Sequence, residues 1–376
     1  MKKINMMFII IIMTFFMGVG AFTIFSKDIL FSADENRYLV GKPNISIERI
    51  LLKDFQNDME KFMSDQIPFR NQLMVSATVI KKSTGIKNIN DAYIGKNGFY
   101  FEKITDNDIH KERFKKNLQF INTFIQDYEN IEFRVMLVPG AGNILSQYLP
   151  KAARVYDYDR LAEEVKNTFG SEKVIELEKS LKDGAKEYHM FANTEMYYKT
   201  DHHWTAFGAY IGYKQFSKSH CRKAKNFTIQ KLTDNFYGTL YSKVMDIKKE
   251  GDIIYAPSDL AQVKVDNGEK ITDSIYDMEK KKVKDKYQIF FGGNFGQVNI
   301  TTKNTKGKHL LLLKDSFANS FVPYILDDYD TITMVDLRYF AGNLNLLIKE
   351  KKITEMLLLY EMSNFASDNN IYKILL

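Results

Sequence analysis

The longest hydrophobic run in the chain lies at its amino terminus. Residues 4–25 carry no charged side chain, and Lys2 and Lys3 precede them. A helix needs about 20 apolar residues to cross roughly 30 Å of hydrocarbon, whereas the apolar core of a cleaved signal peptide, the alternative, spans about 7 to 15. We therefore expect residues 1–27 to form a cytoplasmic tip and an uncleaved transmembrane anchor. The two lysines predict that everything after Lys27 lies outside the cell.

Behind the anchor, a helical pattern precedes a hairpin. Apolar residues recur at helical spacing over residues 45–63, and the pattern resumes over 71–82. Further on, Asn97-Gly98 separates two short runs of β-forming residues, which is typical of a tight β-hairpin. We therefore expect residues 28–88 to form a stalk and a helical segment, followed by one large domain over 89–376.

Short apolar runs alternate with helical patterns in the large domain. Three such runs near the carboxyl terminus, at 310–313, 332–335 and 356–359, are separated by helical patterns. This alternation predicts parallel strands connected by crossover helices. The expected fold class is therefore α/β, an open parallel sheet with helices on both faces. The predicted helices lie at 109–128, 206–219, 317–326 and 344–351, and a further strand lies at 131–138.

Residues 220–300 interrupt this alternation. Clusters of Thr, Tyr, Gly and Asp separate short alternating runs there, such as 253–256 and 288–291. We interpret the segment as a β-rich insertion. Its charge run at 279–286 is typical of a solvated loop, with contact to an anionic cell-surface polymer as the alternative.

Composition narrows the function classes only slightly. The 376 residues include 53 lysines and arginines against 47 aspartates and glutamates, and no nucleic-acid-binding motif accompanies the resulting charge of +6. Nucleic acid is therefore not an expected partner. Cys221 is the only cysteine, so no disulfide can form within the chain and core packing must supply the stability.

Candidate chemistry lies in two short stretches far apart in the sequence. Asp201, His202 and His203 are consecutive and precede a predicted helix, for which Thr205 is placed as the cap. In an extended segment, residues two apart project to the same side, so Asp201 and His203 can lie together while His202 points away. Ser316 follows a buried strand and precedes a helix, so amide N–H groups and the helix dipole can stabilise negative charge beside it.

The two stretches together contain the groups of a Ser-His-Asp triad. A serine hydroxyl needs a base within hydrogen-bond reach and a third group that orients the base. Ser316, His203 and Asp201 can supply these three functions. Two alternatives stay open from the residues alone. Asp and His are ligand types that bind divalent cations, and Asp315 or Ser316 would also serve as an ordinary helix cap.

The segment from Tyr198 to Thr205, which contains Asp-His-His-Trp, resembles the signature of the bacterial DHHW family. It is also similar to the Asp-x-His-Trp-Thr motif of alginate O-acetylation proteins, which belong to the SGNH hydrolase-like superfamily. The nucleophile motif of that superfamily is usually Gly-Asp-Ser, whereas Lys314-Asp315-Ser316 has lysine in place of glycine. The order Asp, His, Ser along this chain is that of the alginate O-acetylation proteins. The resemblance implies an SGNH-like, flavodoxin-like sheet and a catalytic function for the large domain.

The resemblance also implies roles for individual residues. Ser316 corresponds to the nucleophile, His203 to the general base and acid, and Asp201 to the group that orients His203. Gly293, Asn294 and Arg338 are candidates for oxyanion or substrate binding, with a structural ion pair as the alternative for Arg338. His202, Trp204 and Asp315 are expected to support the motifs. Neither a metal nor a cofactor is expected.

The function implied by this resemblance is O-acetylation of a cell-surface polysaccharide through an acyl-enzyme. The enzyme is expected to be membrane-anchored, with its catalytic domain outside the cell. A multi-spanning membrane acyltransferase is the implied partner, because it would supply acetyl groups across the membrane. A carbohydrate esterase that uses the same triad and a non-catalytic glycan-binding assembly protein are the alternatives.

Overall fold

The computed structural model describes residues 2–35, 37–187, 195–247 and 250–376. The chain divides into two compact units. The first, which we call the amino-terminal unit, comprises residues 1–86 and 242–249. The second, the main unit, comprises residues 87–241 and 250–376.

The amino-terminal unit begins with an exposed apolar helix. Helix α1 (Lys2–Phe25) contains the span Ile4–Phe25, which is long and apolar enough to cross a membrane. The predicted amino-terminal apolar helix is therefore confirmed, although a signal sequence would meet the same criterion. The remaining elements are β1 (Phe31–Ser32), β2 (Arg37–Tyr38), α2 (Ile47–Leu51), α3 (Asp54–Gln66) and α4 (Arg70–Ser83).

Two interruptions divide the helical pattern of this unit. The continuous helix expected over 45–63 is broken at Lys53, whose φ of 65° is left-handed. Between α3 and α4, Ile67 is extended because it precedes Pro68, and the residue before a proline is disfavoured in a helix. Two arginines then hold the β1–β2 ribbon to these helices. Arg37 pairs with Asp65 at 2.5 Å and Arg70 with Glu35 at 2.8 Å.

The main unit is built on a seven-stranded sheet in the order β10-β9-β11-β13-β12-β14-β6. Strands β13, β12, β14 and β6 are parallel, whereas β11, β9 and β10 pair antiparallel. The α/β class is confirmed, and the four strands predicted to be parallel are parallel. Three antiparallel strands extend the same sheet, so it is mixed and not the open parallel sheet that was expected. The strands are β6 (Glu132–Val138), β9 (Val263–Asp266), β10 (Ile271–Thr272), β11 (Gln297–Thr302), β12 (His309–Lys314), β13 (Thr331–Val335) and β14 (Glu355–Glu361).

The antiparallel part of the sheet comes largely from the segment expected to be an insertion. Antiparallel neighbours need only a tight turn, whereas parallel neighbours need a long crossover. Strands β9 and β10 are joined by such a turn at Gly268, whose φ is 84°. Strands β7 (Ile229–Phe236) and β8 (Asp252–Pro257) form a separate pair. The run at 288–291 is not a strand, because residues 286–289 form a 3-10 helix and Phe291 is left-handed.

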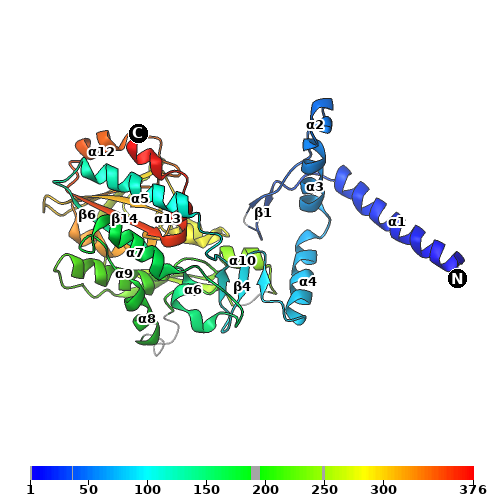
Figure 1. Ribbon diagram of the computed structural model, residues 1–376, viewed down its shortest axis with the longest axis horizontal. Coiled ribbons are helices and arrows are strands. Elements are labelled where there is room, and N and C mark those ends of the chain that lie inside the picture. The colour runs from blue at the N-terminus through cyan, green and yellow to red at the C-terminus, as the bar shows by residue number, and fades with distance from the viewer. Residues whose placement is uncertain (1, 36, 188–194, 248–249) are drawn as a thin grey trace. The chain divides into compact units, whose positions relative to one another are not determined.

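Helices cover both faces of the central sheet (Figure 1). Along β12, Leu310 and Leu312 pack into one core with helix α9 (Ala206–Ser219), while Leu311 and Leu313 pack into the other. The second core contains apolar residues of α5 (Lys111–Gln126), α7 (Tyr158–Phe169) and α12 (Leu344–Glu350). The other helices are α6 (Ala141–Ile144), α8 (Glu178–Glu187), α10 (Thr239–Val244), α11 (Ala318–Phe321) and α13 (Met362–Ser367).

The structure contains the predicted hairpin at residues 93–101 and a shorter form of the helix predicted over 317–326. The hairpin expected at Asn97-Gly98 is present, since Ile94 of β4 (Ala92–Ile94) pairs with Tyr100 of β5 (Tyr100–Glu102). It adjoins β3 (Asn88–Ile89). The helix expected over 317–326 is short: α11 ends at Phe321 and a 3-10 helix continues to Asp328. Pro323, which has no N–H to donate, accounts for the change of helix type.

Candidate active site

Ser316 lies just beyond the carboxyl end of β12, the strand that pairs in parallel with both β13 and β14. This edge of a parallel sheet is where ligands bind in open α/β folds. Asp315 holds the turn, because its carboxylate accepts hydrogen bonds from the Phe317 N–H (2.9 Å), the Glu361 N–H (3.0 Å) and the Asn364 side chain (2.8 Å). Asp315 therefore ties the serine turn to the end of β14 and does not itself contact His203.

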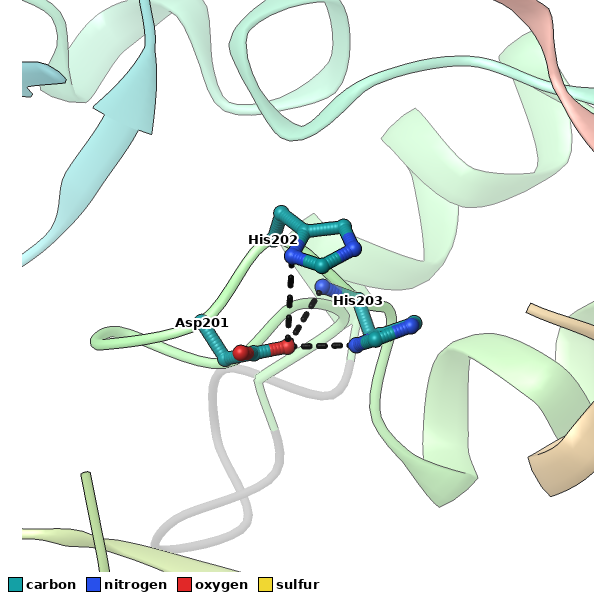
Figure 2. Close-up of side chains that lie close together, drawn as sticks. All are labelled: Asp201, His202 and His203. Carbon is teal, nitrogen blue, oxygen red and sulfur yellow. Dashed lines mark hydrogen bonds and ion pairs between the residues drawn. The ribbon is translucent and has the colours of Figure 1, made fainter. Parts of the chain in front are cut away.

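The structure brings Asp201, His203 and Ser316 into one hydrogen-bonded row. His203 Nε2 lies 2.7 Å from Ser316 Oγ, and His203 Nδ1 lies 2.5 Å from Asp201 Oδ1. Asp201 Oδ1 also accepts the His203 backbone N–H at 3.0 Å, as the dashed lines in Figure 2 show. Because an ionised carboxylate only accepts, the imidazole proton lies on Nδ1 and the lone pair of Nε2 faces the serine hydroxyl.

Burial and hydrogen bonding set the charges of this row. Burial alone would raise the pKa of Asp201, but the two histidines and the hydrogen bonds from His203 and Thr239 lower it well below its usual range. Burial, together with the neighbouring His202, lowers the pKa of His203 to about 4, although Asp201 opposes the shift. At neutral pH the pair is therefore a carboxylate and a neutral imidazole, the state that a general base requires.

Three further side chains position the histidine and the serine turn. Tyr287 stacks on the His203 ring at 3.9 Å and donates a hydrogen bond from its hydroxyl to the Ser316 carbonyl at 3.2 Å. Trp204, fully buried, donates from Nε1 to the Phe317 carbonyl at 2.9 Å. Trp204 thus connects the histidine segment directly to the serine turn. The predicted Thr205 cap is confirmed, since its hydroxyl accepts the N–H groups of Phe207 and Gly208.

Thr239, which the sequence did not single out, completes the surroundings of Asp201. Its backbone N–H donates to Asp201 Oδ2 at 2.8 Å and its hydroxyl donates to the same oxygen at 3.2 Å. The hydroxyl oxygen also lies 2.8 Å from His202 Nδ1. His202 is therefore held beside the row, with its ring 4.0 Å from that of His203 and its Nδ1 3.8 Å from Asp201 Oδ1.

Gly238 gives a way to displace Asp201 without replacing it. A Cβ at this glycine would overlap the Asp201 side chain, with Cγ only 2.6 Å away. Gly238→Ala is therefore expected to shift the carboxylate and to lower the turnover of an acetyl ester by about 100-fold, the scale of a 1 Å misplacement. Steady-state kinetics on protein whose fold is verified by circular dichroism measures this. Wild-type turnover would show that the position of Asp201 does not matter.

The three residues expected to bind an oxyanion or substrate differ in their hydrogen-bond partners. The Gly293 N–H donates to the Phe290 carbonyl at 3.2 Å, so in this conformation the turn uses it. Arg338 forms a two-pronged ion pair with Asp336, at 2.8 and 2.6 Å. Asn294 differs from these two, because Lys314 and Asn319 fix the direction of its amide. Asn294 Oδ1 accepts from Lys314 Nζ at 3.3 Å and from Asn319 Nδ2 at 3.0 Å.

Lys314, which stands where glycine is usual, is fully buried. Its ammonium reaches Asn319 Oδ1 at 3.0 Å and lies 3.8 Å from the Asp336 carboxylate. Burial lowers the pKa of Lys314 to about 8, against the opposing attraction of Asp336. Through these contacts the lysine aligns Asn294 and Asn319 beside the serine turn.

Two clusters of the described residues contain metal-ligand types. In the cluster of Asp201, His202 and His203, the candidate ligand atoms hydrogen-bond to one another, to Thr239 or to Ser316. The geometry therefore favours a proton-transfer row over a metal site. The second cluster was not expected from sequence: His220 Nε2 lies 2.7 Å from Glu355 at the amino end of β14, the edge opposite Ser316.

Glu361, the last residue of β14, is a buried carboxyl that the sequence did not single out. It accepts hydrogen bonds from the hydroxyls of Tyr156 (2.9 Å) and Ser363 (2.5 Å) and from the Asn364 N–H (2.8 Å). Burial raises its pKa to about 7 even though the bonds from Ser363 and Asn364 oppose the shift. A group with this pKa links the stability of the site to pH.

Glu361→Gln is expected to remove part of the pH dependence of stability. Between pH 4.5 and 7 the folded protein keeps this proton while the unfolded chain has lost it, so stability falls as pH rises through that window. The shift corresponds to about 3 kcal/mol. Glutamine keeps the shape without ionising, so the variant should exceed the wild type in unfolding free energy at pH 7.5 but not at pH 4.5. If chemical denaturation gives the same difference in unfolding free energy between variant and wild type at pH 4.5 and at pH 7.5, this prediction is wrong.

Glu355→Gln is the matched control for that experiment. Although burial opposes it, the hydrogen bonds from His220 and Tyr329 lower the pKa of Glu355. Its charge therefore stabilises the folded state at neutral pH, and this contribution is lost as pH falls through the folded pKa. The Glu355→Gln variant should be less stable than the wild type at pH 7.5, opposite in sign to Glu361→Gln.

The family model described as DHHW protein matches residues 162–335, a span that contains Asp201, His203 and Ser316. The resemblance to the DHHW family is confirmed. No curated protein matches the chain.

The chain is also similar to several solved structures. A DHHW family protein from Eubacterium siraeum has 21% identity and a TM-score of 0.62, over 76% of this chain and 95% of that one. PatB1 from Bacillus cereus has 23% identity and a TM-score of 0.56, over 74% of this chain and 97% of that one. The structure of PatB1 with a sulfonyl adduct has 22% identity and a TM-score of 0.56, over 74% of this chain and 98% of that one. The O-acetyltransferase domain of Pseudomonas putida AlgJ has 12% identity and a TM-score of 0.47, over 74% and 93%. At the identities of the first two proteins the likeness is one of fold.

Proposed function

We propose that this DHHW-like chain is a membrane-anchored O-acetyltransferase that modifies a cell-surface polysaccharide through an acetyl-Ser316 intermediate. The observation that carries the proposal is the buried row from Asp201 Oδ1 to His203 Nδ1 (2.5 Å) and from His203 Nε2 to Ser316 Oγ (2.7 Å). These distances are those that a general base and its nucleophile need. The acetyl group and the polysaccharide are suggested by the motif resemblance.

In the first half-reaction, Ser316 takes an acetyl group from an acetyl ester or thioester donor. Ser316 Oγ attacks the carbonyl carbon while its proton passes to His203 Nε2. The resulting imidazolium is stabilised by the Asp201 carboxylate, which lies against Nδ1. When the tetrahedral intermediate collapses, the bond to the leaving group breaks and His203 returns the proton to that group.

In the second half-reaction, a sugar hydroxyl replaces the leaving group. Neutral His203 removes the proton of the hydroxyl as its oxygen attacks the acetyl carbon of acetyl-Ser316. Collapse breaks the bond to Ser316 Oγ, which recovers the proton, and the acetylated sugar departs. The negative oxygen formed in each step needs hydrogen-bond donors. We propose the Ser316 N–H and the Asn294 side-chain amide, whose oxygen is already engaged by Lys314 and Asn319.

The choice of acceptor separates this function from that of a carbohydrate esterase. With water as the acceptor, the same row would release free acetate. Full-length protein in detergent should therefore be incubated with a chromogenic acetyl ester, with and without an oligosaccharide. Acetylated oligosaccharide, seen by mass spectrometry, supports the transferase. Acetate as the sole product under both conditions would favour the esterase.

A non-catalytic glycan-binding role makes a different prediction for the serine. PatB1, which shares the fold, is known with a sulfonyl adduct. We expect a sulfonyl fluoride to modify Ser316 of this chain, because the neighbouring His203 can activate the hydroxyl. Peptide mapping of treated protein locates the modification. Folded protein that takes up no label at Ser316 would favour the binding role.

An enzyme that is anchored with its catalytic domain outside the cell needs a supply of acetyl groups there. We propose that α1 holds the enzyme at the outer face of the membrane, where a multi-spanning acyltransferase delivers the acetyl group. Protease treatment of intact cells should degrade the main unit if it lies outside. Protection of the main unit in intact cells, with degradation after lysis, would contradict this orientation.

A further inference from the structure

A buried lysine lies directly before the serine turn. Lys314 is the last residue of β12 and stands two positions before Ser316, and its side chain is only 2% exposed. Among the described residues it is the only buried lysine or arginine. Burial of an ammonium group is costly unless hydrogen bonds and opposite charge compensate for the lost hydration. The partners of Lys314 therefore indicate what its charge does.

The Lys314 ammonium begins a chain of hydrogen bonds that ends at the protein surface. Its Nζ donates to Asn319 Oδ1 at 3.0 Å and to Asn294 Oδ1 at 3.3 Å, and Asn319 Nδ2 donates to the same Asn294 oxygen at 3.0 Å. Asn319 is buried, and its backbone N–H donates to the Ser316 carbonyl at 3.2 Å. Asn294, in contrast, is exposed. The chain therefore connects a buried cation to an exposed amide beside the serine turn.

These two donors fix the direction of the Asn294 amide. An amide oxygen accepts hydrogen bonds and an amide nitrogen donates them, so Oδ1 must face Lys314 and Asn319, and Nδ2 is turned away from both. In the described part of the chain, no acceptor takes up the Nδ2 protons. The Gly293 N–H is less suited to binding an oxyanion, because it already donates to the Phe290 carbonyl. Asn294 is thus held as a hydrogen-bond donor.

The charged groups around Lys314 hold its proton only weakly. Asp336, which follows β13, lies 3.8 Å from Nζ, but it also pairs with Arg338 at 2.6 Å. Burial lowers the pKa of Lys314 to about 8, since the attraction of Asp336 and Asp315 is opposed by Arg338. At the end of neighbouring β14, burial raises the pKa of Glu361 to about 7, so this carboxyl must be separated from the lysine in any test.

We propose that Lys314 is a positioning residue whose ammonium form holds the Asn294 amide as a donor to the negative oxygen of acetyl transfer. The inference rests on the proposed transferase function and adds an alkaline limit to it. A neutral amine has one N–H fewer and no charge, and charge-assisted hydrogen bonds are roughly twice as strong as neutral ones. Deprotonation of Lys314 therefore loosens Asn294, and the transition state loses a well-aligned donor.

The pH profile of the wild-type protein is the first test, because it needs no variant. The measured quantity is the maximal rate at which a chromogenic acetyl ester acetylates Ser316 in single turnovers of full-length protein. This rate should fall about tenfold as the pH rises through about 8, less than the roughly 100-fold cost of removing an oxyanion donor. Glu361→Gln should keep this fall, whereas its loss in that variant, or a flat wild-type profile, would overturn the proposal.

Lys314→Met removes the charge but keeps an unbranched side chain. At pH 7 the variant should acetylate Ser316 about tenfold more slowly, with no further fall at alkaline pH. The half-saturating ester concentration should not change, because the negative oxygen exists only in the transition state. Lys166→Met is the matched control, since it removes a lysine of α7 that pairs with Glu176 outside the site. The control should keep both the wild-type rate and the alkaline fall.

A double-mutant cycle tests whether Lys314 acts through Asn294. Asn294→Ala alone should lower the acetylation rate about 100-fold. If the lysine acts through this amide, the addition of Lys314→Met to Asn294→Ala should cost less than about twofold more, because the two side chains are coupled. Independent losses that multiply in the double variant would overturn the proposal, as would a wild-type rate in Lys314→Met.

The failure of this inference can be told apart from the failure of the proposed function. If acetyl-Ser316 forms equally fast in the wild type and in Lys314→Met, the lysine proposal fails alone. If acetyl-Ser316 does not form in the wild type, NMR of protein labelled with 15N-asparagine still tests the contact. The Asn294 side-chain resonance, identified by its absence in Asn294→Ala, should move as the pH rises through about 8 in the wild type but not in Lys314→Met. A resonance that does not move in the wild type overturns the proposal.

Discussion

Ser316→Ala is expected to lower acetyl transfer to the surface polysaccharide by at least about 10⁴-fold. The variant removes the only atom that can carry the acetyl group in the proposed mechanism. It leaves His203 with its Asp201 partner, so the base persists without a nucleophile. The first measurement is the O-acetyl content of the surface glycan in a strain that expresses the variant. The second is the rate at which purified full-length protein cleaves an acetyl ester.

Ser217→Ala is the matched control for this prediction. Ser217 is a buried serine of α9 that lies outside the proposed row, so the variant makes the same chemical change in a comparable environment. It should acetylate the glycan like the wild type. Wild-type O-acetylation in the Ser316→Ala strain would remove the acyl-enzyme mechanism, and the row would then need another role.

The parallel half of the sheet could be predicted because its strands are fully buried. The runs around Leu310 to Leu313 and Met356 to Leu359 are apolar at every position, which is typical of strands covered on both faces. The antiparallel half could not be predicted as part of the same sheet. Val263 and Val265 of β9 alternate with polar residues, a pattern that any two-stranded ribbon also shows, so the sequence does not reveal that β9 pairs with β11.

The row of Asp201, His203 and Ser316 was predictable because each member has a local signature. The consecutive Asp-His-His residues precede a capped helix, and Ser316 follows a buried strand. The expected extended segment with His202 pointing away is wrong, because residues 201–203 form a bend in which His202 Nδ1 lies 3.8 Å from Asp201 Oδ1. The neighbours of the row lack such signatures. Thr239 and Tyr287 reach the site from segments 38 and 84 residues beyond Asp201 and His203, and nothing in their own sequence context distinguishes them from ordinary core or turn residues.

The candidate anion-binding residues show the limit of position-by-position inference. Gly293 was selected by resemblance, and its N–H donates to the Phe290 carbonyl. Arg338 forms an ion pair with Asp336, which was the alternative to substrate binding. Glu361 and Tyr156 were not selected, although they form the buried wall of a cavity beside His202. Their juxtaposition depends on the pairing of β14 with β6 and on the loop after β6, which are contacts between distant segments.

His203→Gln is expected to lower kcat/KM for an acetyl ester by about 10⁴-fold, whereas His202→Gln should cost no more than about tenfold. His203 hydrogen-bonds to both Asp201 Oδ1 and Ser316 Oγ. His202 bonds to the Thr239 hydroxyl and helps to lower the pKa of His203, so its loss alters the surroundings of the base but leaves the base in place. In the wild type, kcat/KM should fall as the pH drops through about 4, because protonation of His203 removes the base.

This pair of variants also tests the metal interpretation of the Asp-His-His cluster. A site in which both imidazoles bind a divalent cation would lose activity and metal together in either variant, since each ligand contributes to affinity. The hydrogen-bonded row predicts an asymmetric result, because His203 shuttles the proton and His202 does not. Comparable losses in the two variants, with metal found in the wild-type protein by elemental analysis, would contradict the row. Asymmetric losses would assign the chemistry to His203.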